Sequence, residues 1–198
     1  MKFESYEQFY ETIRPLHDGY EPSAEVVAHT QLVDLTPVVG PSGVGKDTLM
    51  TLTGMPKVRS ETTRAPRSNN GQMEQDGVEY NFRHEDLDRF YDDVAKGRFV
   101  QWAPGPDNKF YGSLSSAYPE EGPALIDIVA KSVEGTRALK PYFGSIEVAY
   151  VVADSYESWI ERFKGRGEIS EEVFKKRLME AHSSLQMGIE DSGMHFVV

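Results

Sequence analysis

The sequence predicts an α/β fold in which a parallel sheet lies between helices. Short apolar runs at 124–129, 147–152 and 195–198 are separated by stretches with a helical pattern, which is typical of parallel strands covered on both faces. Another apolar run ends at Val39 in a glycine-rich turn. Segment 60–113 is polar and rich in turn residues, and it predicts a small irregular or antiparallel subdomain.

The composition limits the functions that are open to the chain. Its 198 residues suit one compact domain with small inserted subdomains. The absence of cysteine excludes disulfides and thiolate metal sites, and we expect a cytoplasmic protein. No stretch approaches the length of a membrane span, and residues 1–14 do not resemble a signal peptide. A net charge of −11 disfavours nucleic acid and anionic membranes as partners; the oligomeric state is left open.

Residues 1–34 are predicted to form a helical appendage to the main domain. Ser5 begins a capping-box pattern, and Phe9 and Ile13 would share one face of the helix that follows. A second short helix is expected near residues 23–29. The segment is interpreted as a packing or oligomerisation arm.

Residues 40–46 fit the pattern Gly-x-x-x-x-Gly-Lys between an apolar strand and an expected helix. In such a loop, backbone N–H groups and a helix N-terminus surround a phosphate, and the lysine contacts the β- and γ-phosphates of ATP. The sequence therefore predicts a phosphate-loop NTPase fold. The predicted ATP-binding residues are Gly40, Ser42, Gly43, Val44, Gly45, Lys46, Asp47 and Thr48.

Asp47 stands where phosphate-loop proteins usually have the Ser or Thr that binds Mg²⁺. A carboxylate is also a suitable hard ligand, so either Asp47 or Thr48 could serve Mg²⁺ bound with ATP. Asp127 ends an apolar strand and is a third candidate metal ligand. A buried structural aspartate is the alternative interpretation of that residue.

Further motifs follow the loop in a fixed order, and together they resemble the guanylate kinase family. They lie at 60–67, 76–82, 97–103, 111–113, 125–128 and 162–167, with Arg177 beyond. The resemblance covers about residues 36–198. It implies a guanylate kinase-like domain over 35–198, with a monophosphate-binding subdomain at 58–114 and a helical lid at 155–175.

The resemblance also implies roles for individual residues. Ser60, Arg64, Arg67, Tyr80 and Tyr111 match the residues with which the family binds the acceptor phosphate, and Arg162, Arg166 and Arg177 match its lid and catalytic arginines. Together with Lys46 and Asp127, these three arginines form the predicted catalytic set. Two arginines three residues apart can form bidentate bonds to a phosphate dianion, to which tyrosine hydroxyls add uncharged donors.

The chain departs from the family where the acceptor base is read. The family reads guanine with two carboxylates, whereas this chain has Gln101 and Val129 at the matching positions and retains Ser113. The helix after the phosphate loop is also short. The sequence ends at Val198, where the family continues into an adenine contact and a final helix; either the chain is truncated or the N-terminal appendage fills that space.

These features predict in-line transfer of the γ-phosphoryl group of ATP to a GMP-type nucleoside monophosphate, with Mg²⁺ and possible alteration of base specificity. One alternative is a non-catalytic guanylate-kinase-like binding module. Another is a small kinase acting on a sugar bisphosphate, since some relatives share the Gly-Lys-Asp loop.

Overall fold

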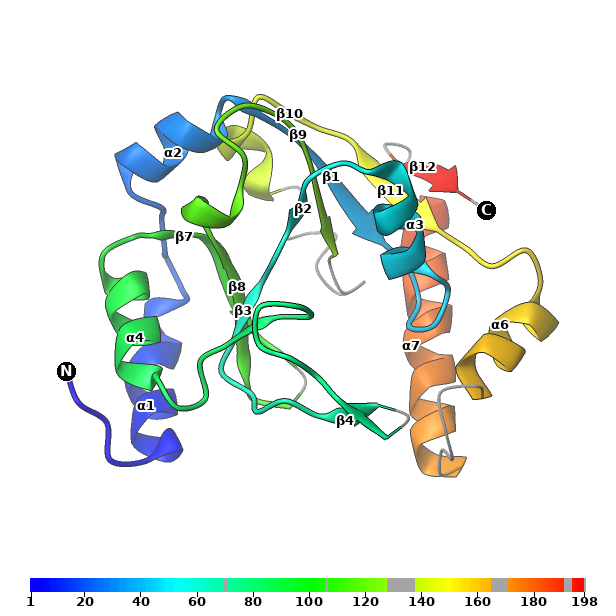
Figure 1. Ribbon diagram of the computed structural model, residues 1–198, viewed down its shortest axis with the longest axis horizontal. Coiled ribbons are helices and arrows are strands. Elements are labelled where there is room, and N and C mark those ends of the chain that lie inside the picture. The colour runs from blue at the N-terminus through cyan, green and yellow to red at the C-terminus, as the bar shows by residue number, and fades with distance from the viewer. Residues whose placement is uncertain (70, 106, 128–137, 165–170, 191–193, 198) are drawn as a thin grey trace. The chain divides into compact units, whose positions relative to one another are not determined.

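The computed structural model describes residues 1–69, 71–105, 107–127, 138–164, 171–190 and 194–197. The chain divides into two compact units, one formed by residues 1–33 with 58–122 and the other by 34–57 with 123–198. Figure 1 labels their helices and strands. No helix in the described ranges is long and apolar enough to cross a bilayer.

The unit that carries the phosphate loop is built on a mostly parallel sheet. Its strand order is β12-β11-β1-β9-β2, and β10 also pairs with β1. Strand β1 runs parallel to β10 and β11, and β11 runs parallel to β12. The strands are β1 (Val33–Val39), β2 (Lys57–Val58), β9 (Gly122–Asp127), β10 (Ser145–Ile146), β11 (Val148–Val151) and β12 (Met194–Val197). The predicted apolar strands are thus confirmed over the described residues.

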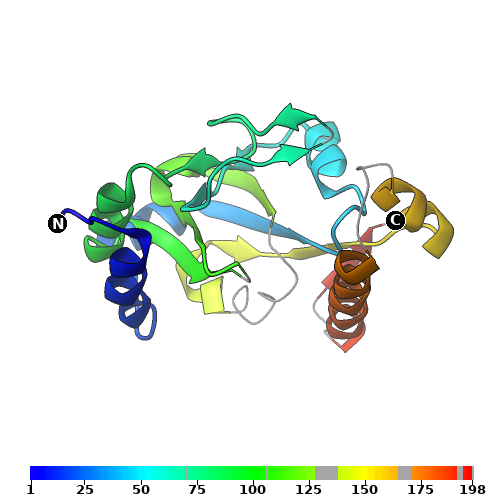
Figure 2. The same ribbon diagram turned by 90° about the horizontal axis from the view of Figure 1, so that it is seen from below.

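Helices flank this sheet. They are α3 (Lys46–Thr53), the 3₁₀ turn η4 (Lys140–Tyr142), α6 (Tyr156–Lys164) and α7 (Glu171–Glu190). Figure 2 shows α3 and α7 on opposite sides of the sheet edge. The buried hydrophobic cluster of this unit joins both helices to the strands. It consists of Val38, Val44, Met50, Leu125, Val151, Trp159 and Ala181. Helix α3 has only eight residues, as the short spacing after the loop predicted.

The other unit holds a mixed sheet of order β6-β3-β8-β7 and a two-stranded hairpin, β4 with β5. Antiparallel pairing dominates the sheet, because β8 runs antiparallel to both β3 and β7, whereas β3 and β6 are parallel. The strands are β3 (Glu61–Thr62), β4 (Ser68–Asn69), β5 (Gln72–Met73), β6 (Asn81–Phe82), β7 (Phe99–Pro104) and β8 (Phe110–Leu114). The helical elements are α1 (Tyr6–Ile13), η1 (Arg14–Leu16), α2 (Ala24–Thr30), α4 (Leu87–Ala95) and η2 (Ser115–Ala117).

The N-terminal segment belongs to this second unit and helps to form its core. Ser5 caps α1 by accepting a hydrogen bond from the backbone of Gln8, and Ser23 caps α2 in the same way. Phe9 and Ile13 are fully buried, as their spacing predicted. Helix α1 lies beside α4 (Figure 1). The shared cluster consists of Phe9, Ile13, Phe90, Val94, Phe99, Trp102 and Phe110.

Phe9 lies at the centre of this cluster, with ring contacts to Phe3, Tyr6, Phe90 and Phe110. We expect Phe9→Ala to lower the free energy of unfolding of this unit by about 3–5 kcal/mol, because it removes a buried ring and leaves a cavity. Urea denaturation followed by circular dichroism measures the change. Leu16→Ala, at an exposed position, is the control and should change stability by less than about 0.5 kcal/mol. Equal midpoints for the two variants would contradict a core role for α1.

Candidate functional site: a phosphate loop and an arginine clamp

The phosphate loop follows β1 and leads into α3. Gly40 lies so close to β11 that an added Cβ would come within 2.3 Å of the carbonyl oxygen of Val151. Gly45 has φ of 106° and forms the N-cap of α3, a conformation that side chains with a Cβ rarely adopt. These two constraints explain glycine at the first and last glycine positions of the motif.

Lys46 is held at the start of α3 by the loop itself. Its Nζ donates to the carbonyl oxygen of Gly40 at 2.9 Å, and it lies 3.7 Å from Oδ1 of Asp127. The lysine side chain is only 12% exposed. The structure therefore brings together two of the predicted catalytic residues.

Helix α6 supports the loop from outside. The indole Nε1 of Trp159 donates to the carbonyl of Ser42 at 2.9 Å, and Nη1 of Arg162 donates to the carbonyl of Val44 at 3.1 Å. Arg162 also lies 3.4 Å from Asp154. Sequence reasoning proposed Arg162 but missed Trp159, since the bond to Ser42 joins positions 117 residues apart and leaves no local pattern.

The three candidate metal ligands lie at the end of β9 and in the first turn of α3. Asp127 Oδ1 is buried and has no hydrogen-bond partner among the described residues. Burial raises the pKa of Asp127, Lys46 partly offsets the shift, and Asp47 reinforces it. Asp47 and Thr48 are exposed, and Asp47 pairs with Lys57. Within the described ranges, no cluster of three His, Cys, Asp or Glu residues could hold a metal alone.

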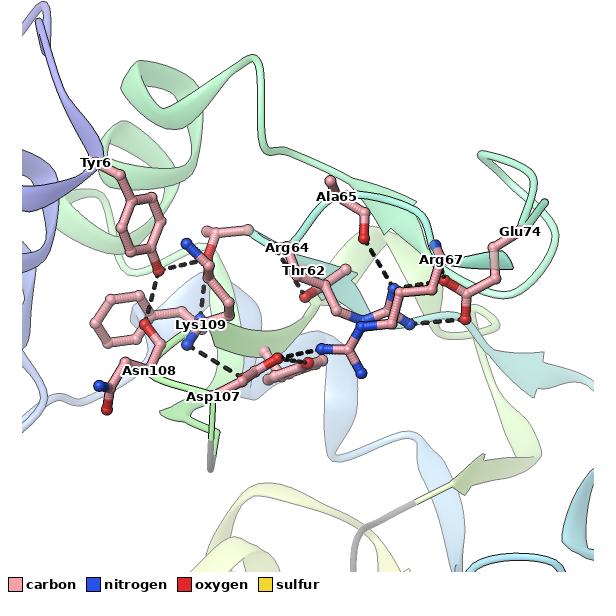
Figure 3. A network of polar contacts seen from close by, with 12 residues as sticks. Tyr6, Thr62, Arg64, Ala65, Arg67, Glu74, Asp107, Asn108 and Lys109 are labelled. Carbon is pink, nitrogen blue, oxygen red and sulfur yellow. Dashed lines mark hydrogen bonds and ion pairs between the residues drawn. The ribbon is translucent and has the colours of Figure 1, made fainter. Parts of the chain in front are cut away.

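A second constellation lies in the other unit, at the ends of β3 and β8 (Figure 3). Arg64 Nη2 donates to Glu74 Oε1 at 2.8 Å, and Nη1 of Arg64 donates to the other carboxylate oxygen. The guanidinium carbon of Arg64 lies 4.9 Å from the ring centroid of Tyr80. Arg67 Nη2 donates to Asp107 Oδ2 at 2.6 Å, and the hydroxyl of Tyr111 donates to the same oxygen at 3.1 Å. We call Arg64, Arg67, Tyr80 and Tyr111 the arginine clamp.

Glu74 is the carboxylate that fixes Arg64 in this clamp. The side chains of Arg64 and Glu74 are 7% and 8% exposed, and Glu74 also accepts a hydrogen bond from the backbone N–H of Arg67 at 2.8 Å. Burial alone would raise the pKa of Glu74, but the bonds from Arg64 and Arg67 outweigh it and hold the pKa below the ordinary 4.5. Sequence reasoning missed Glu74, although it lies only ten residues after Arg64.

The predicted base-reading residues lie on β7 and β8. Gln101 Nε2 donates to Ser113 Oγ at 3.4 Å, and Ser113 Oγ lies 2.8 Å from the hydroxyl of Tyr118. Ser113 and Tyr118 are buried; burial raises the pKa of Tyr118 and keeps its hydroxyl protonated.

For several predicted site residues the structure gives few or no side-chain contacts. Ser60 is half-buried just before β3, and its carbonyl accepts from the backbone of Asn81. Val129 and Arg166 lie outside the described residues. Arg177 lies on α7, and the position of its side chain is not described.

Comparisons with known proteins show which family the chain resembles. The chain is 34% identical over 158 residues to the guanylate kinase of Myxococcus xanthus (strain DK1622), covering 75% of this chain and 71% of that protein. It is 32% identical over 160 residues to the guanylate kinase of Parasynechococcus marenigrum (strain WH8102), covering 76% and 82%. The chain belongs to the guanylate kinase family.

Family membership makes the protein a kinase, that is, a phosphotransferase. The crystal structure of guanylate kinase from Anaplasma phagocytophilum superposes with a TM-score of 0.51 at 20% identity, over 85% of this chain and 77% of that one, and it supports the fold. No protein-family model matches the chain.

The buried pair of Arg64 and Glu74 leads to a stability prediction. Because the folded state lowers the pKa of Glu74, the pair's stabilisation is fully present above pH 4.5 and is lost as the pH falls below it. Glu74→Gln leaves Arg64 buried without a counter-charge, which costs about 3–5 kcal/mol when one partner is removed.

Urea midpoints at pH 7 and pH 4 measure both effects. The difference between wild type and Glu74→Gln should shrink at pH 4. Glu79→Gln, an exposed carboxylate in the same unit, is the control. A deficit of equal size at both pH values would refute the assigned role of the carboxylate charge.

Proposed function

We propose that the chain transfers the γ-phosphoryl group of ATP to a nucleoside monophosphate of the GMP type, giving the diphosphate. The observation that carries this proposal is the arginine clamp. Its two guanidinium groups and two tyrosines come from three separate stretches of sequence. Arg64 binds Glu74 and lies against the Tyr80 ring, while Arg67 and Tyr111 both bind the carboxylate of Asp107. A phosphate group, like a carboxylate, presents a pair of anionic oxygens that such donors can bind in a bidentate manner.

Each part of the chain would contribute positioning and charge neutralisation, which dominate phosphoryl transfer. The backbone N–H groups of the phosphate loop and Lys46 would bind the β- and γ-phosphates. Arg162 and Trp159 hold carbonyl groups of that loop and would keep its N–H groups oriented. Arg64 and Arg67 would bind the acceptor phosphate.

The residues present fit Mg²⁺. The buried oxygen of Asp127 has no hydrogen-bond partner within the part of the chain that the structure describes, and the Asp47 carboxylate is exposed beside the loop. Mg²⁺ is commonly held by one or two carboxylates together with substrate phosphates, so Asp127 and either Asp47 or Thr48 would hold it. When bound, the ion would neutralise phosphate charge.

Transfer is tested by an ADP-release assay over GMP, dGMP, AMP, dAMP, IMP and CMP, with Lys46→Ala as the loss-of-charge variant. We expect activity with at least one purine monophosphate and a loss of at least about 10³-fold in Lys46→Ala, because Lys46 neutralises charge on the transferred group. Lys140→Ala, at an exposed position of η4 in the same unit, is the control. Absence of transfer to every acceptor would favour the non-catalytic binding module.

We further propose that base discrimination is weaker than a carboxylate pair would give. The Gln101 amide can offer one uncharged acceptor to the N1–H and N2–H₂ groups of guanine, and its second N–H can serve a different base. A hydrogen bond to a charged group contributes about 1.5–3 kcal/mol, against about 0.5–1.5 kcal/mol for a neutral one. Gln101 would therefore bind guanine less strongly than glutamate would.

Gln101→Glu should raise the ratio of kcat/KM for GMP to that for AMP by about 5- to 30-fold, which corresponds to about 1–2 kcal/mol. Gln31→Glu, which adds the same charge at an exposed position of the same unit, should leave the ratio unchanged. A wild-type preference for GMP above about 10⁴, within the range of dedicated hydrogen-bonding sites, would contradict the proposal. So would an unchanged ratio in Gln101→Glu.

A further inference from the structure

The arginine clamp holds two carboxylates, and they differ in how firmly they are bound. Glu74 accepts three hydrogen bonds, its side chain is 8% exposed, and its partner Arg64 is 7% exposed. Asp107 is 27% exposed, and its partner Arg67 is 54% exposed. Exposed pairs of this kind contribute little to stability, whereas a buried pair cannot lose one member cheaply. The clamp thus holds Glu74 firmly, whereas it holds Asp107 loosely enough for a ligand to replace it.

Asp107 lies where an anionic ligand of the clamp would bind. One oxygen, Oδ2, accepts from both Arg67 Nη2 and the hydroxyl of Tyr111. These are two of the groups that the proposed function assigns to the acceptor phosphate. The two guanidinium groups and the two carboxylates cancel in formal charge, so a phosphate dianion meets a neutral clamp unless Asp107 withdraws. Burial and the neighbouring Asp107 both raise the pKa of Tyr111, despite Arg64 and Arg67, so its hydroxyl keeps its proton.

The loop that carries Asp107 is held in place by the N-terminal segment (Figure 3). The Tyr6 hydroxyl donates to the carbonyl of Asn108 at 2.8 Å and lies 3.1 Å from Thr63 Oγ1, and the ammonium of Lys109 lies 3.2 Å from the Tyr6 ring centroid. Burial raises the pKa of Tyr6 to about 12, which keeps this donor protonated. The other carboxylate oxygen of Asp107 accepts from the backbone of Lys109 at 3.2 Å. The position of Asp107 is therefore set by several contacts.

We infer that Asp107 is a built-in competitor for the acceptor phosphate, which it resembles in charge, and that the substrate must displace it from Arg67 and Tyr111. This inference rests on the proposed function. Asp107 would set the affinity of the site for the phosphate group without contributing to recognition of the base. An acceptor would bind only if its phosphate competes successfully with a tethered carboxylate.

Asp107→Asn tests the inference, because it removes the charge and keeps both the size of the side chain and the acceptor for the Lys109 N–H. Binding is measured by calorimetry without ATP, using GMP and guanosine as probes. We expect Asp107→Asn to lower the Kd for GMP by about 5- to 20-fold and to leave the Kd for guanosine unchanged, since guanosine has no phosphate. A tenfold change corresponds to about 1.4 kcal/mol. Where turnover is observed, the KM for GMP should fall and the KM for ATP should not.

Asp86→Asn is the matched control, since it removes the same charge from a 51% exposed aspartate in the same unit. Asp107→Ser repeats the test with a smaller side chain that can still accept from Lys109. Unchanged or weaker GMP binding in both Asp107 variants would overturn the inference, as would an equal gain for guanosine or for Asp86→Asn. Failure of the proposed function would appear separately, as absence of phosphoryl transfer in the wild type.

Discussion

Arg64 carries a positive charge at a buried position, and the contacts of Glu74, Arg67 and Tyr80 depend on that buried charge. Such a charge is tolerated only when a counter-charge and hydrogen bonds replace its hydration. The carboxylate of Glu74 accepts two hydrogen bonds from the guanidinium. It also accepts from the backbone N–H of Arg67, while the backbone N–H of Glu74 donates to the Arg67 carbonyl, and these two bonds close the β4–β5 hairpin. The ring of Tyr80 contacts the guanidinium. The orientation of Arg64 is consequently fixed before any ligand binds.

Like Arg64, other cations of this acidic chain lie beside carboxylates. A protein with a net charge of −11 must concentrate positive charge to bind phosphates, yet five cations in and around the phosphate loop and the arginine clamp are each paired with a carboxylate. The pairs are Lys46–Asp127, Lys57–Asp47, Arg64–Glu74, Arg67–Asp107 and Arg162–Asp154. Anion binding at these cations would therefore be an exchange of one negative group for another. The strength of that binding would depend on which carboxylates can be displaced, and exposed carboxylates are displaced more easily than buried ones.

Local rules made much of this molecule predictable from its sequence. The phosphate loop, the start of α3, the Ser5 cap and the short helix near residues 23–29 depend on neighbouring residues, and the structure confirms each. The contacts of Trp159 and Tyr6 span more than 100 residues, so no local pattern could reveal them. Glu74 and Asp107 were missed for another reason: a charged residue in a polar, turn-rich segment is usually solvated, and only the fold shows which ones face an arginine.

The two halves of the proposed acceptor site differ in the kind of interaction that they offer. On the phosphate side the described side-chain hydrogen bonds of Arg64, Arg67 and Tyr111 involve a charged partner, whereas Gln101, Ser113 and Tyr118 on the base side are uncharged. Charged hydrogen bonds are about twice as strong as neutral ones. Since every nucleoside monophosphate carries the same phosphate, the stronger interactions would bind all of them alike. Discrimination among acceptors would then rest on the weaker, neutral network, whose buried hydroxyls are already bonded to each other and would reject a base mainly by shape.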